Sequence, residues 1–287
     1  MESMKIRVGE LTFDATTCGQ RGQPLVLFLH GFPQTSYAWR HQLPFLAAQG
    51  YCCVAPDQRG YSAGARPAEQ DQYAMALLVE DMLGVMDALD YPEAHIVGHD
   101  WGGQISWLLG ALHPDRVRSL TVLSRPHPAA FGRAMKDDAK QSGRSGHHRA
   151  FMNKDSARLL LEEDARRLRR TLSGQGVAEE HIRAYLEVLG DEDALDAAIN
   201  WYRVRGPNRD LAGANIPVVK VPTLYLWGDA DATVGRMAVD RTRDFVSPGQ
   251  YRLVVVPGAG HFITDQVVDV VNDNLLEHIR QAEIDRN

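Results

Sequence analysis

The sequence is built around short apolar runs that are rich in β-branched residues and end in glycine or a polar turn. Runs of this kind occupy residues 24–31, 51–57, 94–100, 119–124, 223–229 and 251–261. Most are continuously apolar, which is typical of parallel strands covered on both faces. Residues 73–90, 103–114 and 266–285 instead carry apolar residues at helical spacing. This alternation predicts an α/β fold, with a mostly parallel central sheet and helices on both faces.

Two segments depart from the alternation of strand and helix. The N-terminal stretch KIRVGELTFDATTCG alternates apolar and polar residues, which predicts an antiparallel edge hairpin. Residues 126–216 contain helical and polar segments and no convincing strand. We therefore predict a core domain formed by 1–125 and 217–287 and a helical lid subdomain formed by 126–216. Such a lid would cover the carboxyl ends of the strands, where open α/β sheets bind ligands.

Charge and composition exclude several classes of protein. The net charge of −6 over 287 residues argues against a surface that binds nucleic acid or anionic membranes. The arginines of EEDARRLRRTL follow acidic residues and are interpreted as a solvated helix face. No run approaches the roughly 20 apolar residues of a membrane span, and the N-terminus lacks the apolar centre of a signal peptide.

Three cysteines, Cys18, Cys52 and Cys53, do not form a disulfide framework and are interpreted as reduced. Together with the lack of a targeting signal, they lead us to expect a cytoplasmic protein. The sequence leaves the oligomeric state open, with a homodimer among the alternatives.

A glycine-flanked carboxylate follows one of the predicted strands. In HIVGHDWGGQ, Asp100 stands between Gly98 and the pair Gly102 and Gly103. The string has the G-x-nucleophile-x-G form of a strand–turn–helix elbow, whose tight turn needs small neighbours and raises the central side chain above the sheet. The N-terminus of the next helix favours an ionised carboxylate there. The alternative is an aspartate that only caps that helix.

An earlier predicted strand ends in residues that could serve this carboxylate. His30, Gly31, Phe32 and Pro33 form the motif that follows the run LFL, where a backbone N–H can face the elbow. We expect the N–H groups of Phe32 and Trp101 to form an oxyanion hole.

The C-terminal part of the chain supplies a base and an acid. His261 lies in VVVPGAGHF on a glycine-rich loop after the last strand, and Asp231 lies in LYLWGDADATV after the preceding strand, with Asp229 as the alternative. The order Asp100, Asp231, His261 is the nucleophile–acid–base order of enzymes with this elbow. A lone loop histidine is usually a surface residue, but this order and context favour a catalytic role.

These residues, together with HGFPQTSYAWRHQLPFLA and VAPDQRGYSAGARP, resemble the α/β-hydrolase family. The resemblance is to its aspartate-nucleophile branch of epoxide hydrolases and dehalogenases, and it covers about 25–279. It implies an α/β-hydrolase fold with an inserted helical lid and a reaction that needs no cofactor. A carboxylate can attack an sp³ carbon and form an alkyl ester, and His261, oriented by Asp231, can then activate water against Cγ of Asp100.

The resemblance also implies proton donors in the lid. AINWYRV matches the family's Asn-Trp-Tyr-Arg segment and places Tyr202 as one donor. Where a second tyrosine is typical, SGHHRAFMN places His148, with His147 one residue away. Some bacterial epoxide hydrolases similarly use a His–Tyr pair. Neither histidine has the spacing of a metal site, so we predict no metal.

We therefore expect an epoxide hydrolase that acts on a small organic epoxide and water, with Phe32, Trp101 and Phe151 against the substrate. One alternative is a haloalkane or haloacid dehalogenase that uses the same three catalytic residues. Haloalkane dehalogenases typically carry Asn where this chain has Phe32, and fluoroacetate dehalogenases carry arginines where it has 102–104. A non-catalytic ligand-binding protein is a further alternative, which fits poorly with an intact nucleophile, acid and base.

Overall fold

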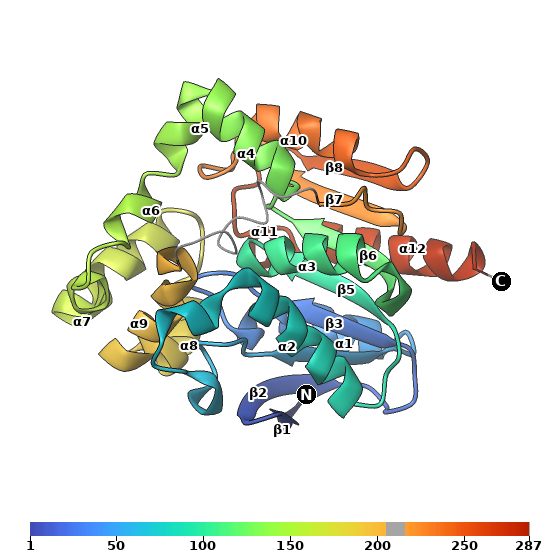
Figure 1. Ribbon diagram of the computed structural model, residues 1–287, viewed down its shortest axis with the longest axis horizontal. Coiled ribbons are helices and arrows are strands. Elements are labelled where there is room, and N and C mark those ends of the chain that lie inside the picture. Colours follow the sequence, from blue (N-terminus) through green and yellow to red (C-terminus); the bar gives the residue numbers. More distant parts are fainter. Residues whose placement is uncertain (205–215, 287) are drawn as a thin grey trace.

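In the computed structural model, which describes residues 1–204 and 216–286, the apolar runs form one eight-stranded sheet (Figure 1). Its strands are β1 (Glu2–Val8), β2 (Leu11–Cys18), β3 (Leu25–Leu29), β4 (Cys52–Pro56), β5 (Ala94–His99), β6 (Val117–Leu123), β7 (Thr223–Gly228) and β8 (Tyr251–Val256). They lie in the order β1-β2-β4-β3-β5-β6-β7-β8. The first two strands form the antiparallel edge hairpin, β2 pairs antiparallel with β4, and all later pairs are parallel. The predicted α/β architecture, a mostly parallel sheet with an antiparallel edge hairpin, is confirmed.

Helices cover both faces of the sheet. The core helices are α1 (Gln42–Ala47), α2 (Met75–Ala88), α3 (Trp101–Leu112), α10 (Arg236–Thr242), α11 (Ile263–Gln266) and α12 (Val268–Ile284). Apolar residues of α2, α3 and α10 pack in one cluster, and those of α1 and α12 pack in another. Cys52 belongs to the first cluster and Cys53 to the second, because successive side chains of a strand point to opposite faces. The strands are therefore continuously apolar because both of their faces are covered.

Six helices lie between β6 and β7 within the described part of the insertion. They are α4 (Pro128–Asp137), α5 (Ala139–Arg144), α6 (His147–Ala150), α7 (Ser156–Ser173), α8 (Glu179–Leu189) and α9 (Glu192–Arg203). Figure 1 shows α5 to α9 gathered at one side of the sheet. The division into a core and a lid at residues 126 and 216 stays a prediction, and residues 205–215 lie outside the described residues.

The helix α7 is broken in the middle. Glu163, Asp164 and Ala165 all adopt left-handed φ angles of 54°, 57° and 55°. Left-handed backbone costs about 1–2 kcal/mol for each non-glycine residue. The buried side chains of Ala165 and Leu168 offset part of this cost by packing against the core.

A buried polar network joins the inserted helices to the core. Asp265 accepts hydrogen bonds from Gln34 at 2.9 Å and from Tyr185 of α8 at 3.2 Å, and it forms an ion pair with Arg40 at 2.7 Å. Both charged side chains are almost fully buried, and a buried charge requires such a partner. The network therefore holds α8 against the core.

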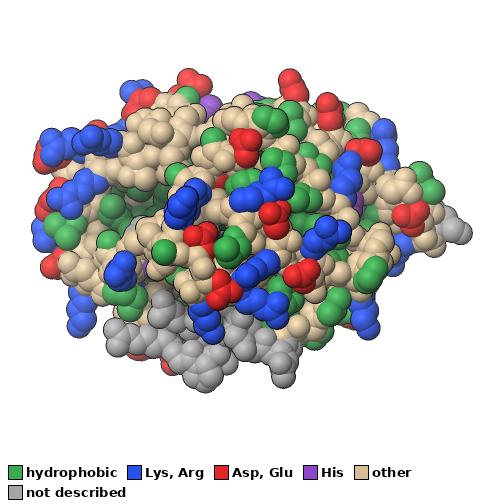
Figure 2. All heavy atoms as spheres, turned by 90° about the horizontal axis from the view of Figure 1, so that it is seen from above, with side chains coloured by type: hydrophobic (Ala, Val, Ile, Leu, Met, Phe, Trp, Pro, Cys, Tyr) green, Lys and Arg blue, Asp and Glu red, His purple; other side chains and the backbone are tan. Residues whose placement is uncertain are grey.

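The surface is mixed in charge where Figure 2 shows it, with Lys and Arg side chains lying among Asp and Glu side chains. In the described ranges, no helix combines the length and apolar character that crossing a membrane requires.

Candidate active site

Asp100 lies in the tight turn between β5 and α3. Its φ of 50° and ψ of −115° place it in a strained backbone conformation, and its side chain makes no capping hydrogen bond to α3. A Cβ at Gly102 would lie 2.0 Å from the carbonyl oxygen of Leu29, and one at Gly98 would lie 2.4 Å from that of Gly102. The glycines are therefore required by close backbone approach, as the elbow motif predicts.

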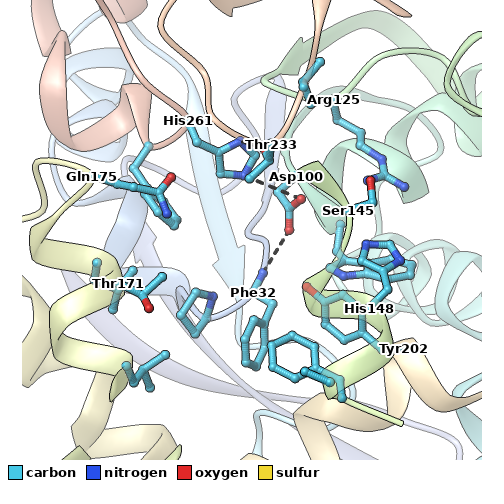
Figure 3. Close-up of a pocket in the computed structure, with 18 of the residues that line it drawn as sticks. Phe32, Asp100, Arg125, Ser145, His148, Thr171, Gln175, Tyr202, Thr233 and His261 are labelled. Carbon is cyan, nitrogen blue, oxygen red and sulfur yellow. Dashed lines mark hydrogen bonds and ion pairs between the residues drawn. The ribbon is translucent and has the colours of Figure 1, made fainter. Parts of the chain in front are cut away.

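The register of the parallel strands brings the candidate residues to one edge. Leu29 pairs with Gly98, His99 with Leu123 and Gly228 with Val256. The residues that follow β3, β5, β7 and β8 therefore meet above the same end of the sheet. Figure 3 shows Asp100 between Phe32 and His261, with Thr233 beside the histidine.

His261 joins the two candidate carboxylates. Its Nδ1 lies 2.9 Å from Oδ2 of Asp231, and its Nε2 lies 3.6 Å from Oδ2 of Asp100. The alternative acid Asp229 instead accepts a hydrogen bond from the N–H of Gly258. The structure thus places Asp231, and not Asp229, against the histidine.

Asp231 and His261 are held by surrounding hydrogen bonds. Oδ1 of Asp231 accepts from the N–H groups of Thr233 and Val234 and from the Thr233 hydroxyl. The Thr233 oxygen also lies 2.7 Å from Nδ1 of His261. The carbonyl of His261 accepts from Ser124 at 2.7 Å and lies 2.9 Å from Nε2 of His99. His99 is therefore a buried positioning residue.

The charges of these groups depend on one another. Burial would raise the pKa of the Asp100 carboxyl, but His261 and then Arg125 hold that pKa below its ordinary value. Burial would likewise lower the pKa of His261, but Asp231 and Asp100 together raise it. The site therefore holds an ionised Asp100 beside a protonated imidazole.

The N–H of Phe32 donates to Oδ1 of Asp100 at 3.2 Å, as expected for one half of the oxyanion hole. His30 supports this loop, because its Nε2 accepts from the N–H of Gln58 and its carbonyl accepts from the Gln58 side chain. A Cβ at Gly31 would lie 2.4 Å from Cβ of Asp100. In the ranges 1–204 and 216–286, no hydrogen bond from the N–H of Trp101 to Asp100 is present, and the oxyanion-hole role of the two N–H groups stays a prediction.

The candidate lid donors lie in an aromatic cluster. The ring centroid of Tyr202 lies 5.2 Å from that of His148, 4.7 Å from Phe151, 5.0 Å from Trp101 and 5.5 Å from Phe32. Figure 3 shows His148 and Tyr202 on one side of Asp100, across from Thr171 and Gln175. Burial, and then the negative charge of Asp100, raise the pKa of Tyr202, which keeps its hydroxyl protonated.

A cavity of about 320 Å³ connects these groups. It is lined by Asp100, His261, Phe32, Pro33, Trp101, Phe151, Tyr202 and His148, together with residues of α7. Sequence reasoning missed Thr233, Arg125 and Gln175 as lining residues. Thr233 stands two positions after Asp231, which was a usable signal, whereas Arg125 and Gln175 had none.

The chain is similar in sequence and in structure to known proteins. The family model described as alpha/beta hydrolase fold matches residues 24–266. Epoxide hydrolase 4 of Mus musculus is 31% identical over 279 residues, covering 94% of this chain and 76% of that protein. Epoxide hydrolase A of Mycobacterium tuberculosis is 32% identical over 307 residues, covering 93% of each chain. The crystal structure of epoxide hydrolase A from Mycobacterium thermoresistibile superposes with a TM-score of 0.86 at 27% identity, covering 97% of this chain and 98% of that one.

Proposed function

The chain belongs to the α/β-hydrolase family, in the branch of the epoxide hydrolases, and from this premise we propose that it converts a small organic epoxide into a vicinal diol through an ester on Asp100. One observation carries the proposal. The Asp100 carboxylate is held by the N–H of Phe32 on one oxygen and faces His261 on the other, at the edge of a cavity that Tyr202 also lines.

The first step is attack of Oδ2 of Asp100 on a ring carbon. The C–O bond of the ring breaks, and the leaving oxygen takes a proton from the hydroxyl of Tyr202, supported by His148 on the same side of the cavity. An epoxide needs such a donor because its leaving oxygen would otherwise depart as an alkoxide. A halide would need none, so the two lid groups support the epoxide over the dehalogenase alternative.

The ester changes the charge of His261. While Asp100 is ionised, two carboxylates raise the pKa of the imidazole and keep it protonated. Esterification removes one of the two negative charges, so the pKa of His261 falls. Its proton can then neutralise the tyrosinate that ring opening leaves, and the neutral imidazole becomes able to act as a base.

The second step is hydrolysis of the ester. His261, oriented by Asp231 and Thr233, takes a proton from water as the water oxygen attacks Cγ of Asp100. The negative charge develops on Oδ1, which the N–H of Phe32 already faces at 3.2 Å. Collapse of this intermediate expels the alkoxide, which takes the proton of the new carboxyl group. The diol leaves, and the ionised Asp100 and protonated His261 are restored.

Isotope labelling tests the covalent route. In a single turnover in heavy-oxygen water, we expect the label in the Asp100 side chain and an unlabelled diol, because the new hydroxyl oxygen comes from the carboxylate. A panel of neutral epoxides and chloro- or bromoalkanes identifies the leaving group in parallel. Label in the diol alone would exclude the ester, and halide release without diol formation would favour a dehalogenase.

The partners follow from this chemistry and are a small organic epoxide and water. The cytoplasmic location and the homodimer alternative stay predictions from the sequence.

A further inference from the structure

Arg125 occupies a place in the cavity that the proposed mechanism does not use. It follows β6 by two positions and lines the cavity at the same sheet edge as Asp100. Figure 3 shows its side chain beside Ser145 and on the same side of Asp100 as His148, away from Thr171.

The guanidinium of Arg125 is buried, and the described groups in direct contact with it are neutral. Its Nε and Nη2 donate to Oε1 of Gln104 at 3.1 and 2.9 Å. Its Cζ lies 4.7 Å from the ring centroid of Phe131 and 5.5 Å from that of Trp101. A guanidinium carries five N–H donors, and Nη1 makes no hydrogen bond to the residues in 1–204 and 216–286.

The other buried arginines differ from Arg125 in this respect. Arg40 pairs with Asp265, Arg59 with Asp81 and Arg203 with Asp196, at 2.6 to 2.7 Å. Within the described part of the chain, Arg125 alone among these four buried arginines lacks a carboxylate partner. A buried charge is stabilised by an opposite charge. Asp100 lines the same cavity and Arg125 lowers its pKa, but no carboxylate of the described residues is in ion-pair contact with the guanidinium, which leaves its N–H groups available to the anion of a ligand.

We propose that Arg125 binds a carboxylate of the substrate, so that the substrate class is a small epoxide that carries a carboxylate near its ring; this rests on the proposed epoxide hydrolysis. The guanidinium suits a planar carboxylate because its fork can donate two parallel hydrogen bonds. Asp100 and Arg125 line the same cavity of about 320 Å³, so the carboxylate must lie close to the ring that Asp100 attacks, as in a 2,3-epoxy acid. The apolar substituent would pack against the apolar lining residues Leu168, Leu172 and Phe262.

A matched pair of substrates tests the assignment. 3-Phenylglycidate and 3-phenylglycidamide have nearly the same shape, but only the first is an anion. We expect the wild-type kcat/KM to favour the acid by at least about tenfold, and Arg125→Met to remove that preference. Arg125→Lys keeps the positive charge without the fork of the guanidinium and should retain part of the preference for the acid. Arg133→Met is the control, because Arg133 stacks on Phe245 and lies outside the cavity lining.

Two results of this assay would overturn the inference. One is equal use of the acid and the amide by the wild-type enzyme. The other is an equal loss on both substrates in Arg125→Met, since Arg125 would then act by keeping Asp100 ionised and not by binding substrate.

A binding measurement separates this inference from the proposed reaction. Calorimetric titration with 3-phenylpropanoate and 3-phenylpropanamide involves no chemistry. We expect the carboxylate to bind at least about tenfold more tightly to the wild type, with the difference lost in Arg125→Met. If this holds while no epoxide is hydrolysed, the proposed function fails and the anion site stands. If neutral epoxides are hydrolysed while the carboxylate has no advantage, the anion site fails and the proposed function stands.

Discussion

The Nδ1 atom of His261 lies 2.9 Å from Oδ2 of Asp231, while Nε2 on the far edge of the same ring lies 3.6 Å from Oδ2 of Asp100. The imidazole therefore responds to two carboxylates, of which only Asp100 faces the cavity. Because an ester on Asp100 would remove one of these charges, the arrangement couples the protonation of the base to the state of the nucleophile.

Replacing the nucleophile should abolish turnover. In Asp100→Asn the neutral amide cannot attack carbon, so kcat should fall by at least about 10³-fold in a diol-release assay. Asp229→Asn is a matched control, because Asp229 only accepts a hydrogen bond from Gly258 and does not line the cavity. It should turn over substrate close to the wild-type rate. Substantial diol formation by Asp100→Asn without conversion back to Asp would exclude Asp100 as the nucleophile.

Removing the base should trap the ester. His261→Gln can still form the alkyl-enzyme, because Phe32 and Tyr202 are unchanged, but it cannot activate water. Intact-protein mass spectrometry should show a gain equal to the mass of the epoxide, located by peptide mapping on Asp100. An unmodified protein after prolonged incubation with a substrate of the wild-type enzyme would contradict the two-step scheme.

Thr233 should act as a positioning residue for the base. Its hydroxyl donates to Asp231 and its oxygen lies 2.7 Å from Nδ1 of His261, so Thr233→Val removes two contacts while keeping the shape. We expect about a tenfold lower rate of ester hydrolysis and little change in ester formation, measured by stopped-flow. Thr233→Ser should restore the rate. Equal losses in both variants would assign Thr233 a packing role.

The lid donors should affect the other half of the cycle. Tyr202→Phe and His148→Gln should each slow ester formation by about 10²-fold, because ring opening loses a proton donor. Ester hydrolysis should be nearly unchanged in a single-turnover experiment. A defect confined to hydrolysis would show that these residues do not protonate the leaving oxygen.

Acid should destabilise the fold through buried histidines. Burial lowers the pKa of His278 from 6.5 to about 4, so the unfolded chain takes up a proton near pH 6.5 that the folded chain accepts only near pH 4. The contribution of the neutral His278 to the free energy of unfolding is complete above pH 6.5 and is lost as the pH falls toward 4. Urea unfolding should show that the free energy of unfolding decreases between pH 7 and pH 5. We expect this decrease to be smaller by about 2 kcal/mol in His278→Gln than in the wild type. An identical decrease in both proteins would show that His278 titrates normally when folded.

Much of the fold follows from local pattern. Each predicted strand and core helix forms within a few residues of its expected bounds, since continuous apolar runs are stable only between two covered faces. The elbow could be predicted for a related reason, because Gly98 and Gly102 approach backbone so closely that a side chain at either position would clash.

The insertion between β6 and β7 was harder to predict. Its helices form where their spacing suggests, but the left-handed break at Glu163 to Ala165 in α7 has no glycine to mark it. Packing of that helix against distant residues outweighs local preference there. The inserted helices therefore line the cavity in a way that spacing along the chain does not record.

The sequence by itself determined where along the chain the candidate catalytic residues lie. Asp100, Asp231 and His261 each follow a recognisable strand, at the edge of the sheet where parallel strands end. Only the tertiary structure decided that Asp231 and not Asp229 reaches the histidine, that Thr233 bridges them, and that Arg125 lines the cavity with no carboxylate of the described residues in ion-pair contact. The physical reason is the separation along the chain of the residues that interact. Strand and turn formation depend on neighbours along the chain, whereas hydrogen bonds and ion pairs depend on which distant side chains the packed sheet and the inserted helices bring within a few ångströms.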